Sequence, residues 1–199
     1  MKEMWDDRYA NDQFLYGFLP NHFFETFIQG LEPGKLLLPG EGEGRHAVFA
    51  ARKGWQVTAV DYSAVGRRKA LMLADQYNVV VDYQIADLAT YVPQTEVYDA
   101  IALVFVHMPS EQRALVHQQM ISGLKPGGRL FLIGFTRAQL QYSSGGPKDE
   151  DWLFSSEALE KEFSGLNIIR NEELITVFNE SQGHQGEGAV VVFEAVKPR

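Results

Sequence analysis

The sequence predicts an α/β protein with a doubly wound, mostly parallel sheet and an antiparallel hairpin at its C-terminal end. Short apolar runs alternate with amphipathic stretches between residues 34 and 136, which is typical of strands joined by helical crossovers. Residues 101–106 are an unbroken apolar run, as expected for a strand buried on both faces of a parallel sheet. Residues 167–177 and 188–196 both have strand character, and the connection between them is too short for a parallel return.

The central region alternates strands and helices in a regular order. Five short apolar runs are expected to be strands: residues 35–39, 55–60, 79–85, 101–106 and 129–135. Three stretches between them are compatible with helices: residues 44–53, 63–77 and 109–124. Gly54 stands where a helix ends, and Ser63 can cap the N-terminus of the second helix. The Lys-Pro-Gly-Gly sequence at 125–128 is a turn signal that precedes the fifth strand.

The 199 residues are expected to form a single domain with four regions. Residues 1–33 are aromatic-rich and are interpreted as an N-terminal cap, and residues 34–136 as the ligand-binding core. The polar residues 137–155 are interpreted as a lid segment, in which the Ser-Ser-Gly-Gly run at 143–146 favours mobility. Residues 156–199 supply a further helix and the terminal hairpin.

Charge and composition exclude several classes of function. The net charge is −8, from 18 Lys and Arg against 26 Asp and Glu, and the longest basic run is only residues 67–69. Nucleic acids and anionic membranes are therefore not expected partners, because both are bound through clustered cations. The chain has no cysteine and no apolar run long enough to span a membrane. We therefore expect a cytoplasmic protein, and the spacing of the five histidines gives no reason to expect a metal site.

A glycine-rich loop follows the first expected strand. Gly40, Gly42 and Gly44 alternate with Glu41 and Glu43, and the helix after them offers free backbone N–H groups at its N-terminus. The pattern G-x-G-x-G differs from the G-x-G-x-x-G of dinucleotide-binding loops, in which a pyrophosphate lies against the helix. Two acidic residues in this position disfavour a diphosphate and are compatible with a cationic ligand.

Acidic residues also follow the second and third expected strands. Asp61 comes 19 residues after Gly42, and an acidic residue at this strand tip binds ribose hydroxyls in nucleoside-binding α/β sheets. Asp87 stands at the next strand tip, where its carboxylate can accept a hydrogen bond from an adenine amino group while Leu88 offers an apolar wall. The alternatives are a helix-capping role for Asp61 beside Ser63 and a turn role for Asp87.

Motifs along nearly the whole chain resemble one family. They are Trp-Asp-Asp-Arg-Tyr at 5–9, Leu-Leu-Pro-Gly-Glu-Gly-Glu-Gly-Arg at 37–45, Val-Thr-Ala-Val-Asp-Tyr-Ser at 57–63, Ala-Asp at 86–87, Leu-Lys-Pro-Gly-Gly at 124–128, Gly-Gly-Pro at 145–147 and His-x-Gly at 184–186. In order and spacing they resemble class I S-adenosylmethionine-dependent methyltransferases. More narrowly, they are similar to the small tellurite-resistance and thiopurine-methyltransferase type.

The resemblance implies a Rossmann-like sheet that binds S-adenosyl-L-methionine as cofactor. The cofactor-binding residues that it implies are Gly40, Glu41, Gly42, Arg45, Asp61, Tyr62, Ser63, Ala86, Asp87, Leu88, Val104 and Phe105. The chain departs from the family at Leu38, where an acidic residue is usual, and at Glu41, where Cys or Ala is frequent. Glu41 is interpreted either as a replacement for the missing carboxylate near the methionine ammonium or as a residue that faces solvent.

The expected activity is methyl transfer to a small-molecule acceptor by a monomer or homodimer. A soft acceptor, such as a thiolate or a selenium or tellurium species, needs no general base. An oxygen or nitrogen acceptor would need one. His107, after the fourth strand, is the first candidate for that base, with a capping or packing role as the alternative.

The substrate contacts are expected at Tyr9, Tyr16 and His184. The N-terminal aromatic residues, the lid and the hairpin connection at 178–187 are expected to converge over the strand tips at 106–107, because ligands bind at the carboxyl ends of the strands in such sheets. His184 then either contacts substrate or faces solvent. The alternative function is a catalytically inactive nucleoside-binding regulatory protein, and a nicotinamide-dependent reductase is disfavoured by Arg45 and the acidic loop.

Overall fold

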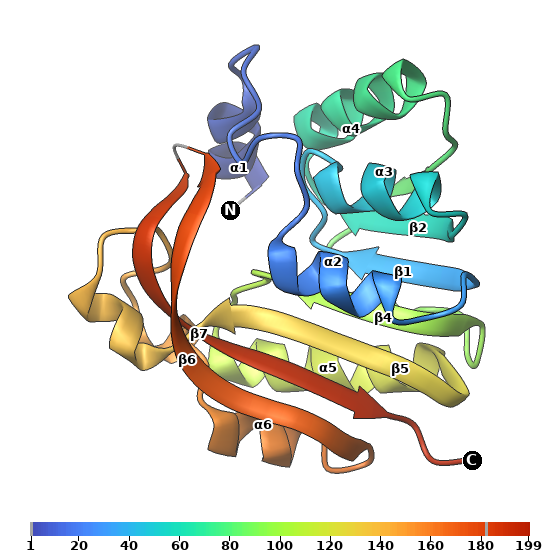
Figure 1. Ribbon diagram of the computed structural model, residues 1–199, viewed down its shortest axis with the longest axis vertical. Coiled ribbons are helices and arrows are strands. Elements are labelled where there is room, and N and C mark those ends of the chain that lie inside the picture. Colours follow the sequence, from blue (N-terminus) through green and yellow to red (C-terminus); the bar gives the residue numbers. More distant parts are fainter. Residues whose placement is uncertain (1, 182) are drawn as a thin grey trace.

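One seven-stranded sheet organises the molecule (Figure 1). The computed structural model describes residues 2–181 and 183–199. The strands are β1 (Lys35–Pro39), β2 (Gln56–Asp61), β3 (Asp82–Ile85), β4 (Tyr98–Val104), β5 (Leu124–Phe135), β6 (Asn167–Ser181) and β7 (His184–Val196). The helices are α1 (Lys2–Tyr9), α2 (His22–Gln29), α3 (Arg45–Arg52), α4 (Ala64–Gln76), α5 (Ser110–Gly123) and α6 (Ser156–Glu162), with 3₁₀ turns η1 (Arg137–Gln141) and η2 (Glu150–Trp152).

The strand order is β3-β2-β1-β4-β5-β7-β6. Strands β1 to β5 are mutually parallel, β7 is antiparallel to β5, and β6 is antiparallel to β7. The predicted doubly wound, mostly parallel sheet with an antiparallel C-terminal hairpin strand is therefore confirmed. All five parallel strands direct their carboxyl ends toward the same edge.

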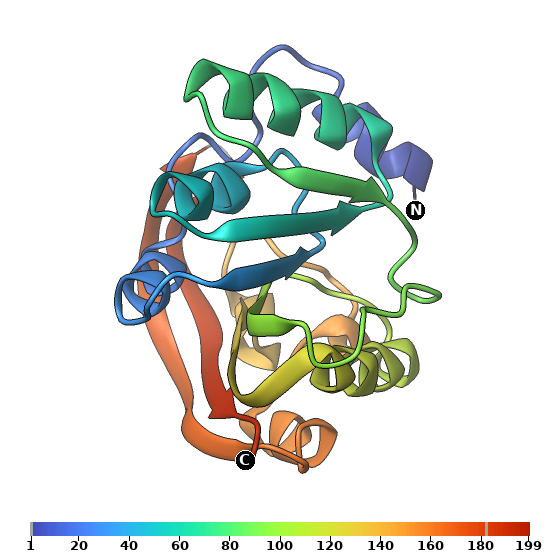
Figure 2. The same cartoon turned by 90° about the vertical axis from the view of Figure 1, so that its right-hand side faces the viewer.

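Helices cover both faces of the sheet (Figure 2), and an apolar layer lies between the sheet and the helices on each face. Because successive strand residues point to opposite faces, Leu36 and Leu38 of β1 face the layer formed with α2, α3 and α4, and Leu37 faces the layer formed with α5 and α6. Burying a large apolar side chain contributes roughly 1.5–3 kcal/mol. Both layers therefore stabilise the sheet, and with it the carboxyl ends of the strands, where the loops after β1, β2, β3 and β4 lie.

The structure differs from the predicted elements in several places. Strand β4 spans Tyr98–Val104 instead of residues 101–106, and β5 begins at Leu124 instead of residue 129, so it includes the predicted turn. Strand β3 begins at Asp82 rather than at residue 79, because the segment before it leaves the sheet and Val80 is exposed. The expected connection at 178–187 is mostly strand, since the ladder continues from Val177 through Phe178 to Ser181, which pairs with His184. The buried ring of Phe178 holds this extension against the core.

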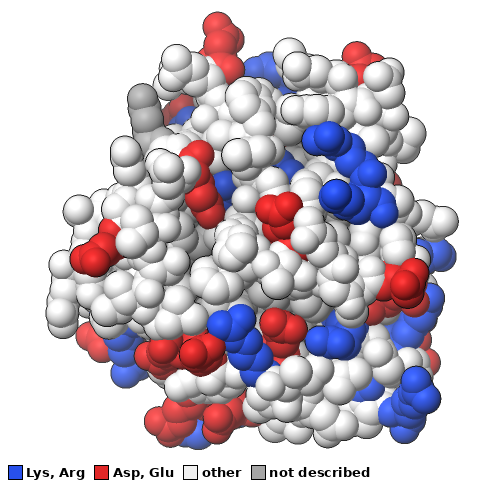
Figure 3. Space-filling view, in the orientation of Figure 1, with Lys and Arg blue, Asp and Glu red and all other residues white. Residues whose placement is uncertain are grey.

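Within the described ranges 2–181 and 183–199, no helix is long and apolar enough to cross a membrane. Lys and Arg are interspersed with Asp and Glu on the visible face, without a patch of one sign (Figure 3).

Candidate functional site

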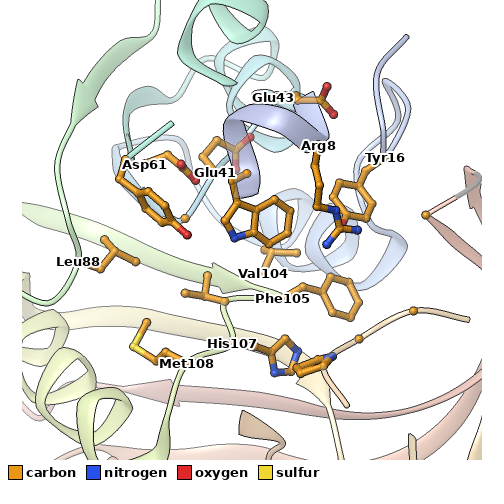
Figure 4. Close-up of a pocket in the computed structure, with 18 of the residues that line it drawn as sticks. Arg8, Tyr16, Glu41, Glu43, Asp61, Leu88, Val104, Phe105, His107 and Met108 are labelled. Carbon is orange, nitrogen blue, oxygen red and sulfur yellow. The ribbon is translucent and has the colours of Figure 1, made fainter. Parts of the chain in front are cut away.

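A cavity of about 460 Å³ lies at the carboxyl edge of the sheet (Figure 4). Most of the predicted site residues line it: Tyr9, Tyr16, Gly40, Glu41, Arg45, Asp61, Tyr62, Asp87, Leu88, Val104, Phe105, His107 and His184. Gly42, Ser63 and Ala86 do not contribute to its wall. The N-terminal segment, the lid segment and the β6–β7 hairpin all contact this cavity through Trp5, Pro147 and His184.

The glycine loop bends where side chains would obstruct it. Gly40 has a φ of +68° and Gly44 a φ of +87°, which is the left-handed region that favours glycine. A Cβ on Gly44 would also overlap the Ala70 side chain of α4. The loop therefore lies close against α4, and Gly40 brings backbone to the cavity wall.

Asp61 ends β2 with its carboxyl group inside the cavity wall. Its Oδ2 accepts a hydrogen bond from the Gly42 amide at 3.0 Å, and its Oδ1 accepts one from the Ser63 amide at 2.8 Å. Burial raises the pKa of Asp61 to about 6, although these two amide hydrogen bonds oppose the shift. A carboxylate has about four acceptor positions, so two remain for a ligand. The Ser63 hydroxyl meanwhile caps α4 by accepting from the Gly66 amide.

The two acidic loop residues have different partners. Glu41 is buried, and its Oε1 accepts hydrogen bonds from the His46 and Ala47 amides at the start of α3. The solvent-facing interpretation of Glu41 is therefore wrong. Glu43 is also buried and forms an ion pair of 2.5 Å with Lys69. Of the two, Glu41 is the one that lies nearer the strand tips in Figure 4.

Lys69 of α4 fastens the N-terminal segment beside this loop. Its Nζ donates hydrogen bonds to the backbone oxygens of Tyr9, Asn11 and Gln13 at 3.2, 2.8 and 2.8 Å. The same ammonium pairs with Glu43, whose Oε2 accepts from the Leu15 amide. We call this arrangement the Lys69 clamp. It fixes the residues that follow α1 over the glycine loop.

Arg45 forms a second connection, between α3 and the hairpin. Its guanidinium donates to the backbone oxygens of Tyr16 and Leu19 and pairs with Glu180 at 2.8 Å. The Asn21 side chain donates to the other oxygen of Glu180 at 2.7 Å. Arg45 therefore lines the cavity while its charge is already neutralised within the protein.

Two cavity histidines have both ring nitrogens occupied. His107 Nδ1 lies 2.9 Å from the Trp152 carbonyl oxygen and therefore donates to it, and its Nε2 accepts from the Phe135 amide. Burial lowers the pKa of His107 to about 4. His46 accepts from the Asn21 amide at Nε2, and its Nδ1 faces Glu41 at 3.4 Å. Neither ring has a free nitrogen for a ligand.

His184 is the first residue of β7 and is buried, so the alternative in which it faces solvent is wrong. Its ring packs among aromatic side chains, with centroid distances of 4.5 Å to Phe105, 4.8 Å to Tyr16 and 5.4 Å to Phe135. Phe105 reaches this cluster from a φ of +55°, a strained conformation for a bulky residue. This cluster forms the apolar end of the cavity.

The lid segment is fastened rather than loose. The Gln139 side chain donates to the Ser144 hydroxyl and to the Gly145 carbonyl oxygen, both at 3.0 Å, and its own Oε1 accepts from the Ala189 amide. Ser144 is buried. The expected mobility of residues 143–146 therefore has no support in these contacts.

Sequence reasoning missed several cavity residues. They include Met4, Arg8, Met108, Gln112 and Phe135. Arg8 stood inside a quoted motif, and the helical spacing from Trp5 to Arg8 and Tyr9 could have placed it on the same face. Arg8 lies beside Tyr16 above Phe105 in Figure 4, and its guanidinium donates to the Tyr16 hydroxyl at 3.4 Å. The others depend on contacts between distant segments.

In the described part of the chain, no group of three or more His, Asp or Glu side chains is arranged to hold a metal ion.

Comparisons with known proteins agree with this architecture. Residues 37–128 match the family model described as "Methyltransferase domain". No curated protein matches the chain.

Many solved structures share the fold. A protein studied in the conversion of a disulfide bond into a thioacetal group during echinomycin biosynthesis aligns with a TM-score of 0.79 and 17% identity, over 100% of this chain and 92% of its own. TehB from Haemophilus influenzae aligns with a TM-score of 0.75 and 15% identity, over 98% of this chain and 66% of its own. The N-methyltransferase NodS from Bradyrhizobium japonicum WM9, in complex with S-adenosyl-L-homocysteine, aligns with a TM-score of 0.73 and 15% identity, over 100% of this chain and 98% of its own.

Proposed function

We propose that this protein, which contains an S-adenosylmethionine-dependent methyltransferase domain, transfers the methyl group to a small, soft acceptor bound beside Phe105 and His184. The observation that carries the proposal is a single cavity with a carboxyl-rich end at Asp61 and an aromatic end at Phe105. A polarisable sulfur, selenium or tellurium atom fits the aromatic end, because such atoms make favourable contacts with ring edges.

The carboxyl-rich end fits the donor. When bound, S-adenosylmethionine supplies a methyl group on a positively charged sulfur. We assign Asp61 to the ribose hydroxyls, because its two unused acceptor positions and its burial suit charge-assisted hydrogen bonds. Asp87 and Leu88 are assigned to the adenine, and Glu41 to the methionine ammonium.

The remaining cofactor-side residues act through the backbone or through their neighbours. Gly40 and Gly42 shape the loop, Ser63 starts α4, and Arg45 joins the cap to the hairpin. Tyr62 and Val104 complete the cavity wall around the donor, and Ala86 follows β3 directly before Asp87.

The cover of the cavity is assigned to three segments. Residues 1–33 serve as a cap, residues 137–155 as a lid and residues 156–199 as the helix and hairpin that carry His184. Together they keep water from the reacting atoms, which in-line transfer requires in addition to alignment at roughly 3–3.5 Å. Tyr9 and Tyr16 belong to the cap, and Tyr16 together with Arg8 lies at the mouth of the acceptor end.

His107 is assigned a positioning role in place of the general-base role. Its Nδ1–H bond to Trp152 and its Nε2 bond to Phe135 join the lid to β5, so proton uptake would break a backbone hydrogen bond. His107 thus sets the position of the lid above the acceptor.

Turnover separates this function from a nucleoside-binding regulator without catalysis. We expect calorimetry to show binding of S-adenosylhomocysteine, and we expect turnover to release it when S-adenosylmethionine is supplied with a panel of thiols, selenols, phenols and amines. Thiols and selenols should react best. Binding without turnover of any acceptor would favour the regulator, and preferential binding of NAD would contradict the assignment altogether.

A further inference from the structure

Three histidines line the cavity, and they differ in what their ring nitrogens contact. His46 and His107 use both nitrogens within the protein. His184 uses only Nδ1, which lies 3.3 Å from Oε2 of Glu180, and Nε2 has no hydrogen-bond partner among the described residues. We propose that His184, oriented by Glu180, is the general base that removes a proton from the acceptor. This role rests on the proposed function, and it implies an acceptor that binds as a protonated thiol.

Glu180 fixes the tautomer of the ring. Its Oε2 pairs with Arg45 at 2.8 Å and its Oε1 accepts from Asn21 at 2.7 Å, so the carboxylate is held from two sides. Those contacts and His184 itself lower the pKa of Glu180 to about 2. An ionised carboxylate can only accept. Nδ1 of His184 therefore carries the hydrogen, and Nε2 presents its lone pair.

The ring is enclosed by aromatic neighbours and remains part of the cavity wall. His184 is only 4% exposed, yet it lines the cavity together with Phe105 and Tyr16. Phe105 contacts it edge-on with centroids 4.5 Å apart, and Phe178 and Phe135 close the other sides. The free nitrogen is therefore sheltered from bulk water and open to an acceptor.

The surroundings keep the imidazole neutral until it accepts a proton. The titratable and charged groups around it are Glu180 on β6, Arg45 and His46 on α3, His107 after β4, and Tyr16 in the cap. Burial lowers the pKa of His184, Arg45 lowers it further, and Glu180 opposes both effects. At neutral pH the ring is thus an available base, and Glu180 stabilises the imidazolium that forms.

The proton and electron balance is complete without a further reactant. The thiol proton passes to Nε2 of His184, and the sulfur electron pair forms the bond to the methyl carbon. The carbon–sulfur pair of the donor returns to the donor sulfur, which leaves S-adenosylhomocysteine, a thioether and an imidazolium. Release of one proton to water restores the enzyme. A thiol with an ordinary pKa of about 8.5 is mostly protonated at neutral pH, so a base is useful even for a soft acceptor.

Two thiols and one pair of matched variants test the role. Benzyl mercaptan is protonated at pH 7, whereas 4-nitrothiophenol is already a thiolate. We expect His184→Gln to lower kcat for benzyl mercaptan by roughly 10²–10⁴-fold and to change kcat for 4-nitrothiophenol only a few-fold. His107→Gln is the control, because it alters another cavity histidine and should affect both thiols equally.

A spectroscopic measurement is independent of turnover. In the dead-end complex with S-adenosylhomocysteine, benzyl mercaptan should shift the ¹⁵N resonance of Nε2 of His184 in the wild-type protein, because the S–H group donates a hydrogen bond to that nitrogen. In His184→Gln the thiol should still bind, as calorimetry measures. Glu180→Gln should shift the acid limb of kcat/KM to lower pH, because the imidazolium loses its countercharge, and loss of packing alone would not move that limb.

The outcomes distinguish this role from the proposed function itself. Equal losses for both thiols in His184→Gln, or an Nε2 resonance that does not respond to the thiol in the wild-type protein, would overturn the role of His184 and leave methyl transfer intact. Failure of wild-type protein to bind S-adenosylhomocysteine by calorimetry would overturn the proposed function instead. Binding without methylation of either thiol would contradict the acceptor class, and with it the base.

Discussion

At the scale of single residues, the most informative polar atoms of the cavity are those without a hydrogen-bond partner within the protein. Asp61 keeps two acceptor positions and His184 keeps one nitrogen, whereas His107 keeps none. Leaving a buried polar group without a partner costs roughly 1–3 kcal/mol. A ligand therefore gains most binding free energy where it forms hydrogen bonds with these unpaired atoms of the cavity wall.

The first prediction concerns Asp61→Ala. We expect the binding free energy of S-adenosylhomocysteine to weaken by roughly 1.5–3 kcal/mol, the usual contribution of charge-assisted hydrogen bonds. The circular dichroism spectrum should remain native. Asp82→Ala, at an exposed residue that begins β3, is the control and should bind normally. If Asp61→Ala folds and its affinity is unchanged, the role of Asp61 is limited to the start of α4.

The second prediction concerns pH. The pKa of Asp61 is raised to about 6 in the free protein, and ribose hydroxyls favour its ionised form. A ligand that binds the ionised form lowers this pKa, so affinity should be constant above pH 6 and decrease as the pH falls below it. Calorimetry from pH 5 to 8 measures this dependence, and the same series on Asp61→Ala should be flat. A decrease of equal size in both proteins would assign the effect to another group.

The third prediction separates backbone strain from steric overlap at glycine. Both Gly44 and Gly186 have positive φ, but a Cβ would overlap Ala70 only at Gly44 and would meet nothing within 4 Å at Gly186. A non-glycine residue in such a conformation costs about 1–3 kcal/mol. Gly186→Ala should therefore lose about that much unfolding free energy in urea, and Gly44→Ala clearly more. Equal losses of unfolding free energy in the two variants would mean that α4 moves to accommodate the new Cβ at Gly44 without a loss of stability.

At the scale of elements, two buried ion pairs attach the N-terminal segment to the sheet. Lys69 joins it to α4, and Arg45 joins it to α3 and the hairpin. The pairing partners lie far apart in the sequence: Lys69 with Glu43, and Arg45 with Glu180. The cap is therefore held by these charged groups together with the buried apolar side chains of α2, such as Phe24 and Ile28.

The fourth prediction is that Lys69→Met destabilises the protein by about 3–5 kcal/mol, the usual cost of leaving a buried charge without its partner. Backbone amides of residues 9–15 should also exchange faster in deuterium. The double variant Glu43→Gln with Lys69→Met should recover part of the loss. Lys161→Met, which breaks an exposed pair with Glu157 on α6, should leave stability nearly unchanged. A loss in that control as large as in Lys69→Met would contradict the clamp.

The elements also show which parts of the fold and the site can be predicted from the sequence. The alternation of strands and helices, the glycine loop and the tips at Asp61 and Asp87 follow from local patterns, because strand periodicity and loop composition are local properties. The Lys69 clamp and the occupied nitrogens of His107 could not be predicted, since each depends on partners brought together only by the fold. The hairpin was predicted too short because glycines within it suggested a loop, while Phe178 extends its burial.

At the scale of the whole molecule, the cavity is assembled from segments at both ends of the chain and from the middle of the sheet. Any ligand that fills it contacts the cap, the strand tips and the hairpin at once. Binding should therefore stabilise the complete structure rather than one loop.

The fifth prediction follows from that linkage. S-adenosylhomocysteine at 100 times its Kd should add about 2.7 kcal/mol to the free energy of unfolding, seen as a higher Tm in calorimetry. NAD and NADP at the same concentration should leave Tm unchanged. If NADP raised Tm and S-adenosylhomocysteine did not, the donor assignment would be wrong.

The position of β7 has a consequence for how the chain acquires its structure. Among the residues that the structure describes, β6 is the edge strand and pairs with β7, which lies between β6 and β5. On a ribosome that adds roughly 5–20 residues per second, β1 to β5 can pair while β6 still has no neighbour in the sheet. Residues 167–181 must then wait, with both backbone edges unpaired, until the following strand emerges and inserts. On this order, the parallel sheet of β1 to β5 can be complete while the acceptor end, to which β7 contributes His184, is still missing.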